Sequence, residues 1–128
     1  MKRTVFFSLL LLAATSFTAC KEKCKGSDGG TLTIVAFPKH HGADTKPLWA
    51  YVKFDAQEFP GADSNSYDLV IKGDSTENHI ELPNLTCGDY FIYEIAYDPA
   101  IQAIVTGGIP YSTEQATGEV NVDIPVTE

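Results

Sequence analysis

Basic residues are scarce in this chain. Nine Lys and Arg stand against 17 Asp and Glu, which gives a formal net charge of −8. Nucleic-acid-binding proteins concentrate Lys and Arg on one face, so this balance argues against a nucleic-acid partner. Cysteine is also scarce, and three cysteines in 128 residues exclude a scaffold held together by many disulfides. The remaining composition, 44% hydrophobic and 20% charged, is that of one ordinary globular domain.

Several motifs that carry catalysis are missing. The chain has no Cys-x-x-Cys, which disfavours a thiol-redox enzyme. It has no Gly-x-Ser-x-Gly and no Gly-rich phosphate loop leading into a helix. Asp55, Glu58 and Asp63 cluster near one turn, and we interpret them as a solvated acidic surface rather than the paired carboxylates of a glycosidase. We therefore expect no enzymatic activity and no cofactor.

Long apolar runs are confined to the N-terminus. Lys2 and Arg3 precede a nearly continuous apolar stretch over residues 5–14, and small residues follow it. The stretch is shorter than the ~20 residues that a membrane-spanning helix needs. A short positive segment before such an apolar core is typical of a secretory signal peptide. We expect residues 1–19 to be removed.

The run ends in Phe17-Thr18-Ala19-Cys20, which resembles the lipobox of bacterial lipoproteins. In that family the peptide is cut before the cysteine, and acyl chains such as palmitate are attached to it. The resemblance implies a lipid-anchored envelope protein with its anchor on Cys20. Lys21 stands where inner-membrane retention signals typically carry Asp, which implies the outer membrane, on its periplasmic or surface face. An ordinary cleavage site with an incidental cysteine is the alternative.

The segment after the lipobox differs from the rest of the chain. Residues 20–30 contain no large apolar side chain and three glycines, so we predict a flexible stalk. Three lysines with a glutamate among them are too few for a lipid-binding basic motif. Removal of residues 1–19 takes the net charge from −8 to −10, which repels anionic headgroups. The lipid is therefore the expected membrane contact.

From residue 31 onward, short β-rich runs alternate with turn signals such as Phe59-Pro60-Gly61, Asp98-Pro99 and Gly107-Gly108. No stretch shows uninterrupted helical periodicity. The run over residues 89–97 is the longest and is apolar on both faces, so we expect a central strand. Residues 31–128 are predicted to form an all-β, antiparallel two-sheet sandwich of seven strands. The predicted strands are 31–37, 49–54, 67–72, 79–82, 89–97, 101–106 and 119–126.

Residues 82–90, Leu-Pro-Asn-Leu-Thr-Cys-Gly-Asp-Tyr, resemble the Leu-x-x-Gly-x-Tyr turn of prealbumin-like sandwiches such as carboxypeptidase-regulatory-like domains. In that family the Leu plugs the end of the sandwich, the Gly makes the turn and the Tyr begins a core strand. The combination of this segment with His40-His41 and Gly107-Gly108-Ile109-Pro110 also looks like that of small lipoproteins of Bacteroidota. That likeness implies a cell-envelope location and no particular activity.

If Cys20 carries lipid, Cys24 and Cys87 remain, and an even number in an oxidising compartment permits a disulfide. Such a bond would fasten the stalk beside the turn that precedes the central strand. In the alternative, Cys24 stays in the stalk as a free thiol and Cys87 is a small buried hydrophobic residue. The sequence leaves both interpretations open.

His40 and His41 form the only histidine pair, followed by Gly42 and Asp44. Imidazole and carboxylate ligands suit Zn²⁺ and Cu²⁺. Neighbours on a strand point to opposite faces, so both histidines can serve one ion only from a loop. Pro38 and Gly42 predict such a loop, and His79 is a candidate third ligand. The alternative is a pair of solvated loop histidines.

Aromatic residues are the other candidate contacts. They could form a stacking platform for a sugar or a peptide, or they belong to the core. We predict a lipid-anchored, non-catalytic binding or accessory module whose partner is another envelope protein or a saccharide. The alternative is a metal-binding lipoprotein that uses His40, His41 and His79. The aromatic candidates are Trp49, Tyr51, Tyr93, Tyr97 and Tyr111.

Overall fold

The computed structural model describes residues 23–128. The predicted signal peptide and Cys20 lie outside the described residues. Apart from a 3-10 turn, η1 (Ser64–Ser66), the described chain has eight strands, and none of its helices is long and apolar enough to cross a membrane. The strands are β1 (Asp28–His40), β2 (Ala43–Asp44), β3 (Lys46–Phe54), β4 (Leu69–Lys72), β5 (Ile80–Leu85), β6 (Gly88–Asp98), β7 (Ala103–Thr113) and β8 (Thr117–Pro125).

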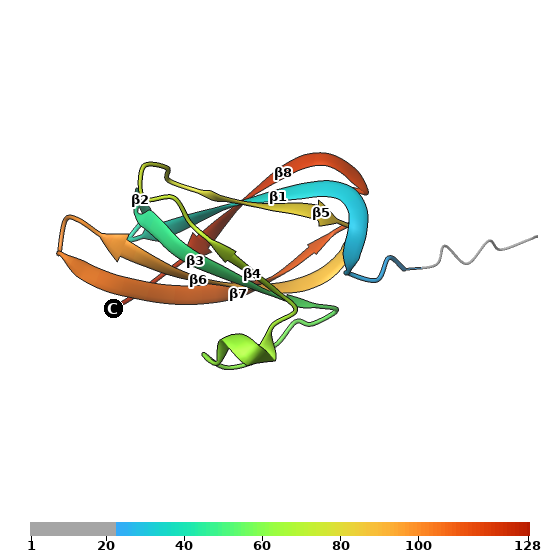
Figure 1. Ribbon diagram of the computed structural model, residues 1–128, viewed down its shortest axis with the longest axis horizontal. Helices are drawn as coiled ribbons and strands as arrows, with labels where there is room; N and C mark the ends of the chain where they lie inside the picture. Colours follow the sequence, from blue (N-terminus) through green and yellow to red (C-terminus); the bar gives the residue numbers. More distant parts are fainter. Residues whose placement is uncertain (1–22) are drawn as a thin grey trace, which may run out of the picture.

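Two sheets pack face to face (Figure 1). In the first, β1 lies between β5 and β8, and the short β2 pairs with the end of β1. The second has the order β4-β3-β6-β7. The predicted all-β sandwich is therefore confirmed, and the run over residues 89–97 lies centrally, within β6. The β1–β8 pair is parallel, however, so the sandwich is not wholly antiparallel.

The structure has eight strands where the sequence predicted seven, because the short β2 was not predicted, and the strand ends also differ from the prediction. β1 has 13 residues and β6 has 11, so the central strand is not the longest. β7 continues through Gly107-Gly108, where the sequence predicted a turn. A Cβ at Gly107 would collide with the Pro125 carbonyl, and one at Gly108 would collide with the Ile92 carbonyl. These glycines allow close packing inside a strand and do not end it.

The N-terminal segment is fastened to the domain. Cys24 and Cys87 form a disulfide with their Cα atoms 5.3 Å apart. The Ser27 N–H donates to Thr86 Oγ1 at 3.0 Å, and β1 then begins at Asp28. The prediction of a flexible stalk over residues 20–30 is thus wrong from Cys24 onward. The disulfide and the backbone hydrogen bonds fix this segment, although it has no large apolar side chain that could pack against the domain.

The core fills the space between the sheets with aliphatic side chains from both. At one end of the sandwich the Leu-x-x-Gly-x-Tyr segment is built as its residues suggest. Leu85 is fully buried, Gly88 has a φ of 139°, and the Tyr90 hydroxyl donates to the Thr86 carbonyl at 2.7 Å. Fully buried core residues include Leu32, Ile34, Ala36, Ala50, Val52, Leu82, Ile92, Val105 and Ile124.

The opposite end of the sandwich is closed by the C-terminal segment. The Val126 N–H donates to the Lys39 carbonyl in the first sheet at 2.9 Å. Thr127 then pairs with Thr106 of β7 in the second sheet. The chain therefore crosses from one sheet to the other and brings Glu128 beside the end of β1.

Candidate metal site

The histidine pair sits where β1 turns into β2. His40 is the last residue of β1 and pairs with Ala43. The two residues between them, His41 and Gly42, have φ values of 50° and 80°. Two left-handed residues make a type I′ hairpin turn, which matches the twist of the strands. Because His41 lies in the turn, its side chain does not point to the face of the strand opposite to His40. The centroids of the two rings are 4.2 Å apart.

His40 is held by a buried carboxylate. Its Nδ1 lies 2.6 Å from Asp98 Oδ2, and both side chains are buried. The Ala100 N–H donates to the other oxygen, Asp98 Oδ1, at 2.8 Å. The hydrogen bond with His40 and the one from Ala100 lower the pKa of Asp98. An ionised Asp98 can only accept, so the proton of the neutral imidazole lies on Nδ1 and the lone pair lies on Nε2.

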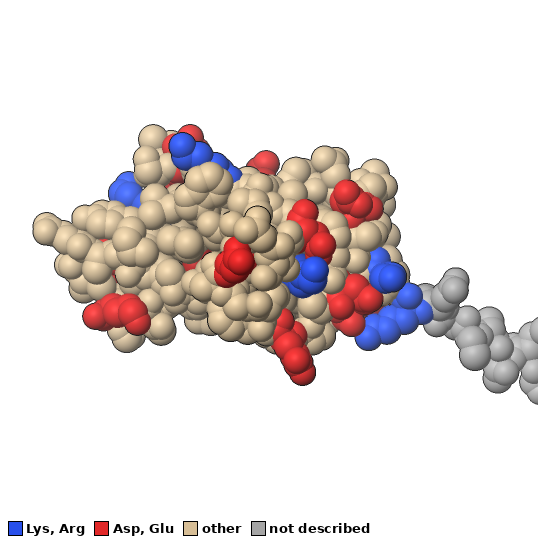
Figure 2. Space-filling model, turned by 60° about the horizontal axis from the view of Figure 1, so that its bottom comes forward, with Lys and Arg blue, Asp and Glu red and all other residues tan. Residues whose placement is uncertain are grey.

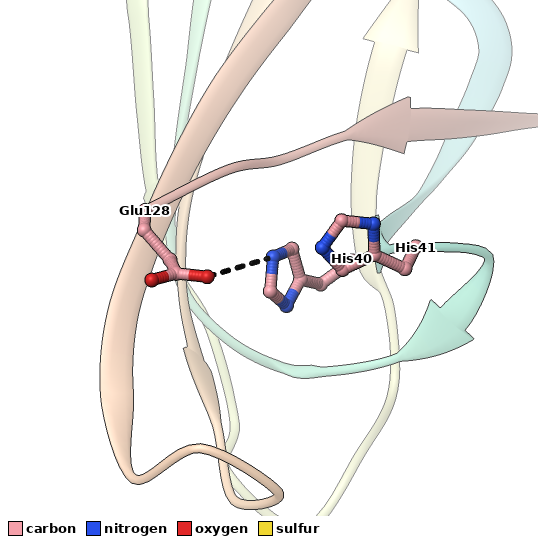
Figure 3. Close-up of side chains that lie close together, drawn as sticks. All are labelled: His40, His41 and Glu128. Atoms are coloured by element: carbon pink, nitrogen blue, oxygen red, sulfur yellow. Dashed lines mark ion pairs between the residues drawn. The ribbon is translucent and has the colours of Figure 1, made fainter.

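His40 Nε2 faces the Glu128 carboxylate, and the His41 ring lies beside the His40 ring (Figure 3). The distance from His40 Nε2 to Glu128 Oε1 is 3.8 Å. One ligand atom each from His40, His41 and Glu128 lie within 4.8 Å of one another. Ligand bonds to Zn²⁺ of ~2.0–2.2 Å place tetrahedral ligand atoms about 3.3 Å apart. His41 and Glu128 are exposed, so rotation of their side chains can close the remaining gap.

The other sequence candidates lie elsewhere. The His79 ring packs against Phe37 at 5.3 Å between centroids, and its Nδ1 lies 3.0 Å from Asn78 Oδ1. The fold therefore does not bring His79 to the histidine pair. Asp44 is bound by Lys39 and Asn78, which lower its pKa. Among the described residues, Glu128 takes the place in the cluster that the sequence suggested for His79.

Asp98 and Glu128 were missed by the sequence analysis. Asp98 precedes a proline and was interpreted only as a turn signal. Its role depends on the packing of the two sheets against each other, which places the end of β6 beside the end of β1. Glu128 reaches the site because the C-terminal segment leaves β8 and crosses to β7. Neither position carries a local motif.

Four of the five aromatic candidates lie on the outer face of the β4-β3-β6-β7 sheet. Residues 55–68 cross part of this face, and Phe59 packs against Phe91 and Tyr93. Tyr93 is only 8% exposed, whereas Trp49 is 38% exposed and lies beside Tyr51. Tyr97 is half-buried, and Tyr111 packs against the core instead. Figure 2 shows a wide area with few charged side chains on this side of the molecule.

The predicted acidic surface is exposed. Asp55, Glu58 and Asp63 all face solvent in the segment that crosses the sheet. Asp63 Oδ1 accepts from the Asn65 N–H at 3.0 Å and so caps η1. The three carboxylates therefore lie in a surface loop.

No protein-family model, curated protein or solved structure matches this chain.

Proposed function

We propose that this chain is a lipid-anchored, non-catalytic module of the bacterial cell envelope that binds a divalent transition-metal ion. The ligands are His40 Nε2, a ring nitrogen of His41 and the Glu128 carboxylate. The ion is Zn²⁺ or Cu²⁺, because imidazole with one carboxylate suits both. The lipobox-like Cys20 supports the anchor, and Lys21 supports an outer-membrane location.

The observation that carries the metal proposal is the buried bond from His40 to Asp98. A metal-binding histidine typically donates its second ring N–H to a carboxylate, which fixes the tautomer and makes the ligand nitrogen more basic. Here that bond is 2.6 Å long and leaves Nε2 directed toward Glu128. A solvated loop histidine has no such buried partner.

The exposure of the site indicates exchangeable binding. His41 and Glu128 face solvent, and three protein ligands leave at least one position for water. Structural zinc sites usually have four protein ligands. The geometry therefore supports reversible binding of an ion and does not require the ion for folding.

Calorimetric titration of the full-length chain with Zn²⁺ and with Cu²⁺ near neutral pH tests this function. We expect one site per chain, with Cu²⁺ bound more tightly, as the usual affinity order of these ions dictates. His40→Gln should abolish the site. His79→Gln is the matched control and should leave the affinity unchanged. Absence of uptake, or equal loss in both variants, would contradict the proposal.

A second candidate function is recognition of another envelope protein or a saccharide. It is favoured by the exposed apolar residues on the outer face of the β4-β3-β6-β7 sheet, where Trp49 is 38% and Ile104 is 53% exposed. Stacking on such side chains suits sugars and peptides. Trp49→Ala should then reduce retention on envelope saccharides or proteins, while the metal affinity stays unchanged.

The prealbumin-like type of the sandwich is also proposed. Support comes from the corner at Leu85, Gly88 and Tyr90, where burial, positive φ and the tyrosine hydroxyl bond agree with the Leu-x-x-Gly-x-Tyr turn. An experimental structure whose sheets followed another strand order would contradict this assignment.

A further inference from the structure

The disulfide and the candidate metal site lie at opposite ends of the sandwich. β1 begins at Asp28, close to the Cys24–Cys87 bond, and ends 13 residues later at His40. The strand bends at its start, because Asp28 and Leu32 both face Leu85, and from Leu32 to His40 it runs about 26 Å at ~3.3 Å per residue. Figure 1 shows the start of the described chain at one end of the molecule and the C-terminus toward the other.

The disulfide limits the distance between the domain and its lipid. Cys20 precedes Cys24 by four positions, so the intervening chain spans at most ~14 Å. Cys24 is covalently fixed to Cys87, and Ser27 is hydrogen-bonded to Thr86. A lipid on Cys20, as the proposed function has it, is therefore held within this reach of the end of the sandwich that carries the disulfide and the turn between β7 and β8.

The charges at this end do not set the orientation. Lys21, Lys23 and Lys25 are three of the seven lysines that remain after signal cleavage, and residues 26–128 contain four lysines and 16 acidic residues. Lys23 is paired with Asp89 at 2.9 Å, and Glu114 lies beside them. Figure 2 shows acidic as well as basic side chains near the point where the described chain begins. The covalent tether through Cys24 therefore decides which end approaches the bilayer.

We propose that the bilayer surface is the partner of this end, so that the domain stands upright on the membrane. The contact surface comprises the residues around the Cys24–Cys87 bond and the turn between β7 and β8. The candidate metal site then lies about 25 Å or more from the headgroups, well beyond the Debye length of ~8 Å, and exchanges ions with the aqueous phase. This orientation rests on the lipid anchor of the proposed function and not on the metal site.

Energy transfer to the membrane tests the orientation. A fluorescent amino acid is placed at Ala116, in the turn between β7 and β8, or at Ser75, in the turn between β4 and β5; both positions are exposed. The lipidated full chain is reconstituted into vesicles of phosphatidylcholine and phosphatidylglycerol that contain an acceptor-labelled headgroup. We expect severalfold stronger transfer from position 116 than from position 75.

Two controls separate the contributions. Insertion of about twenty Gly and Ser residues between Cys20 and Cys24 makes a flexible tether and should greatly reduce the contrast. Replacement of Lys21, Lys23 and Lys25 by Gln should leave the contrast in place, because the covalent tether and not these charges sets the orientation. Equal transfer from the two positions in the unaltered chain, or stronger transfer from position 75, would overturn the orientation alone. A chain that does not float with vesicles would overturn the lipid anchor as well, and neither result would affect metal binding in solution.

Discussion

Asp98 accepts a hydrogen bond from His40 across the space between the two sheets, with 2.6 Å between Oδ2 and Nδ1. His40 ends β1 in one sheet, and Asp98 ends β6 in the other. The bond therefore ties the sheets together at the end that the C-terminal segment also closes. It also fixes the His40 ring so that Nε2 faces Glu128. One buried contact thus links the fold to the candidate site.

Asp98→Asn should weaken metal binding without abolishing it. The variant keeps the shape of the side chain but removes the negative charge that holds the His40 proton on Nδ1. Loss of such a carboxylate partner typically lowers metal affinity about 10–100-fold. Titration with Zn²⁺ measures the effect. Asp123→Asn, on the exposed side of β8, is the control, and equal weakening in both variants would point to general charge attraction instead.

Glu94 makes the stability of the domain depend on pH. Its carboxylate is fully buried, and neither oxygen has a hydrogen-bond partner in the described part of the chain. Burial raises its pKa from 4.5 to about 8. The unfolded chain therefore ionises first, so the free energy of unfolding should fall as the pH rises from about 4.5 to 8 and then level off.

Glu94→Gln should remove most of this pH dependence. Above pH 8 the variant should be more stable than the unaltered chain, by at most about 5 kcal/mol at 1.36 kcal/mol per pKa unit. Urea unfolding at several pH values measures the difference. Glu81→Gln, at an exposed position of β5, should leave the profile unchanged. A Glu94→Gln profile that follows that of the unaltered chain would contradict this account.

The Cys24–Cys87 disulfide should contribute strongly to stability. It joins residues 63 positions apart, and a loop of that size is worth about 4 kcal/mol in the chain-entropy model. Replacement of both cysteines by serine should lower the free energy of unfolding by about that amount. Mass spectrometry of alkylated protein, with and without reduction, checks the bond itself. Two free thiols in the untreated protein would contradict the pairing.

The Tyr90 hydroxyl should stabilise the corner of the sandwich. It donates to the Thr86 carbonyl at 2.7 Å and accepts from the Ser27 N–H at 3.1 Å. Tyr90→Phe removes the donor to the part-buried Thr86 carbonyl, while the Ser27 N–H keeps its bond to Thr86 Oγ1, so the change should cost about 1 kcal/mol. Tyr97→Phe is the control, since the Tyr97 hydroxyl has no hydrogen bond within the described residues. Equal unfolding midpoints for the two variants would show that the corner bond contributes little.

The sequence predicts the elements better than it predicts their ends. Strand alternation places Leu32, Ile34 and Ala36 on one face, and all three are buried. The turn predicted at Gly107-Gly108 is wrong, because the sequence does not distinguish a glycine that permits close packing within a strand from one that permits a turn. The flexible stalk predicted around Gly26 is wrong for the same reason, because Gly26 packs against the Asp89 carbonyl.

The sequence predicts only part of the candidate metal site, and the reason is physical. His40 and His41 are adjacent in sequence, so their proximity follows from a single turn. Asp98 and Glu128 join them only through the packing of the two sheets and the crossing of the C-terminal segment. Such contacts depend on strand order, which hydrophobic periodicity does not specify. His79 was a candidate third ligand because it is a histidine. Its residue type alone does not show that its ring packs against Phe37.

The most direct test is the state of the histidine ring nitrogens, observed by long-range ¹H–¹⁵N NMR correlation as Zn²⁺ is added to the full chain. We predict that His40 carries its proton on Nδ1 before and after binding, that its Nε2 resonance shifts together with a nitrogen of His41, and that His79 does not respond. A His40 ring protonated on Nε2, or Zn²⁺-dependent shifts that are equal at all three histidines or absent from them, would contradict the account.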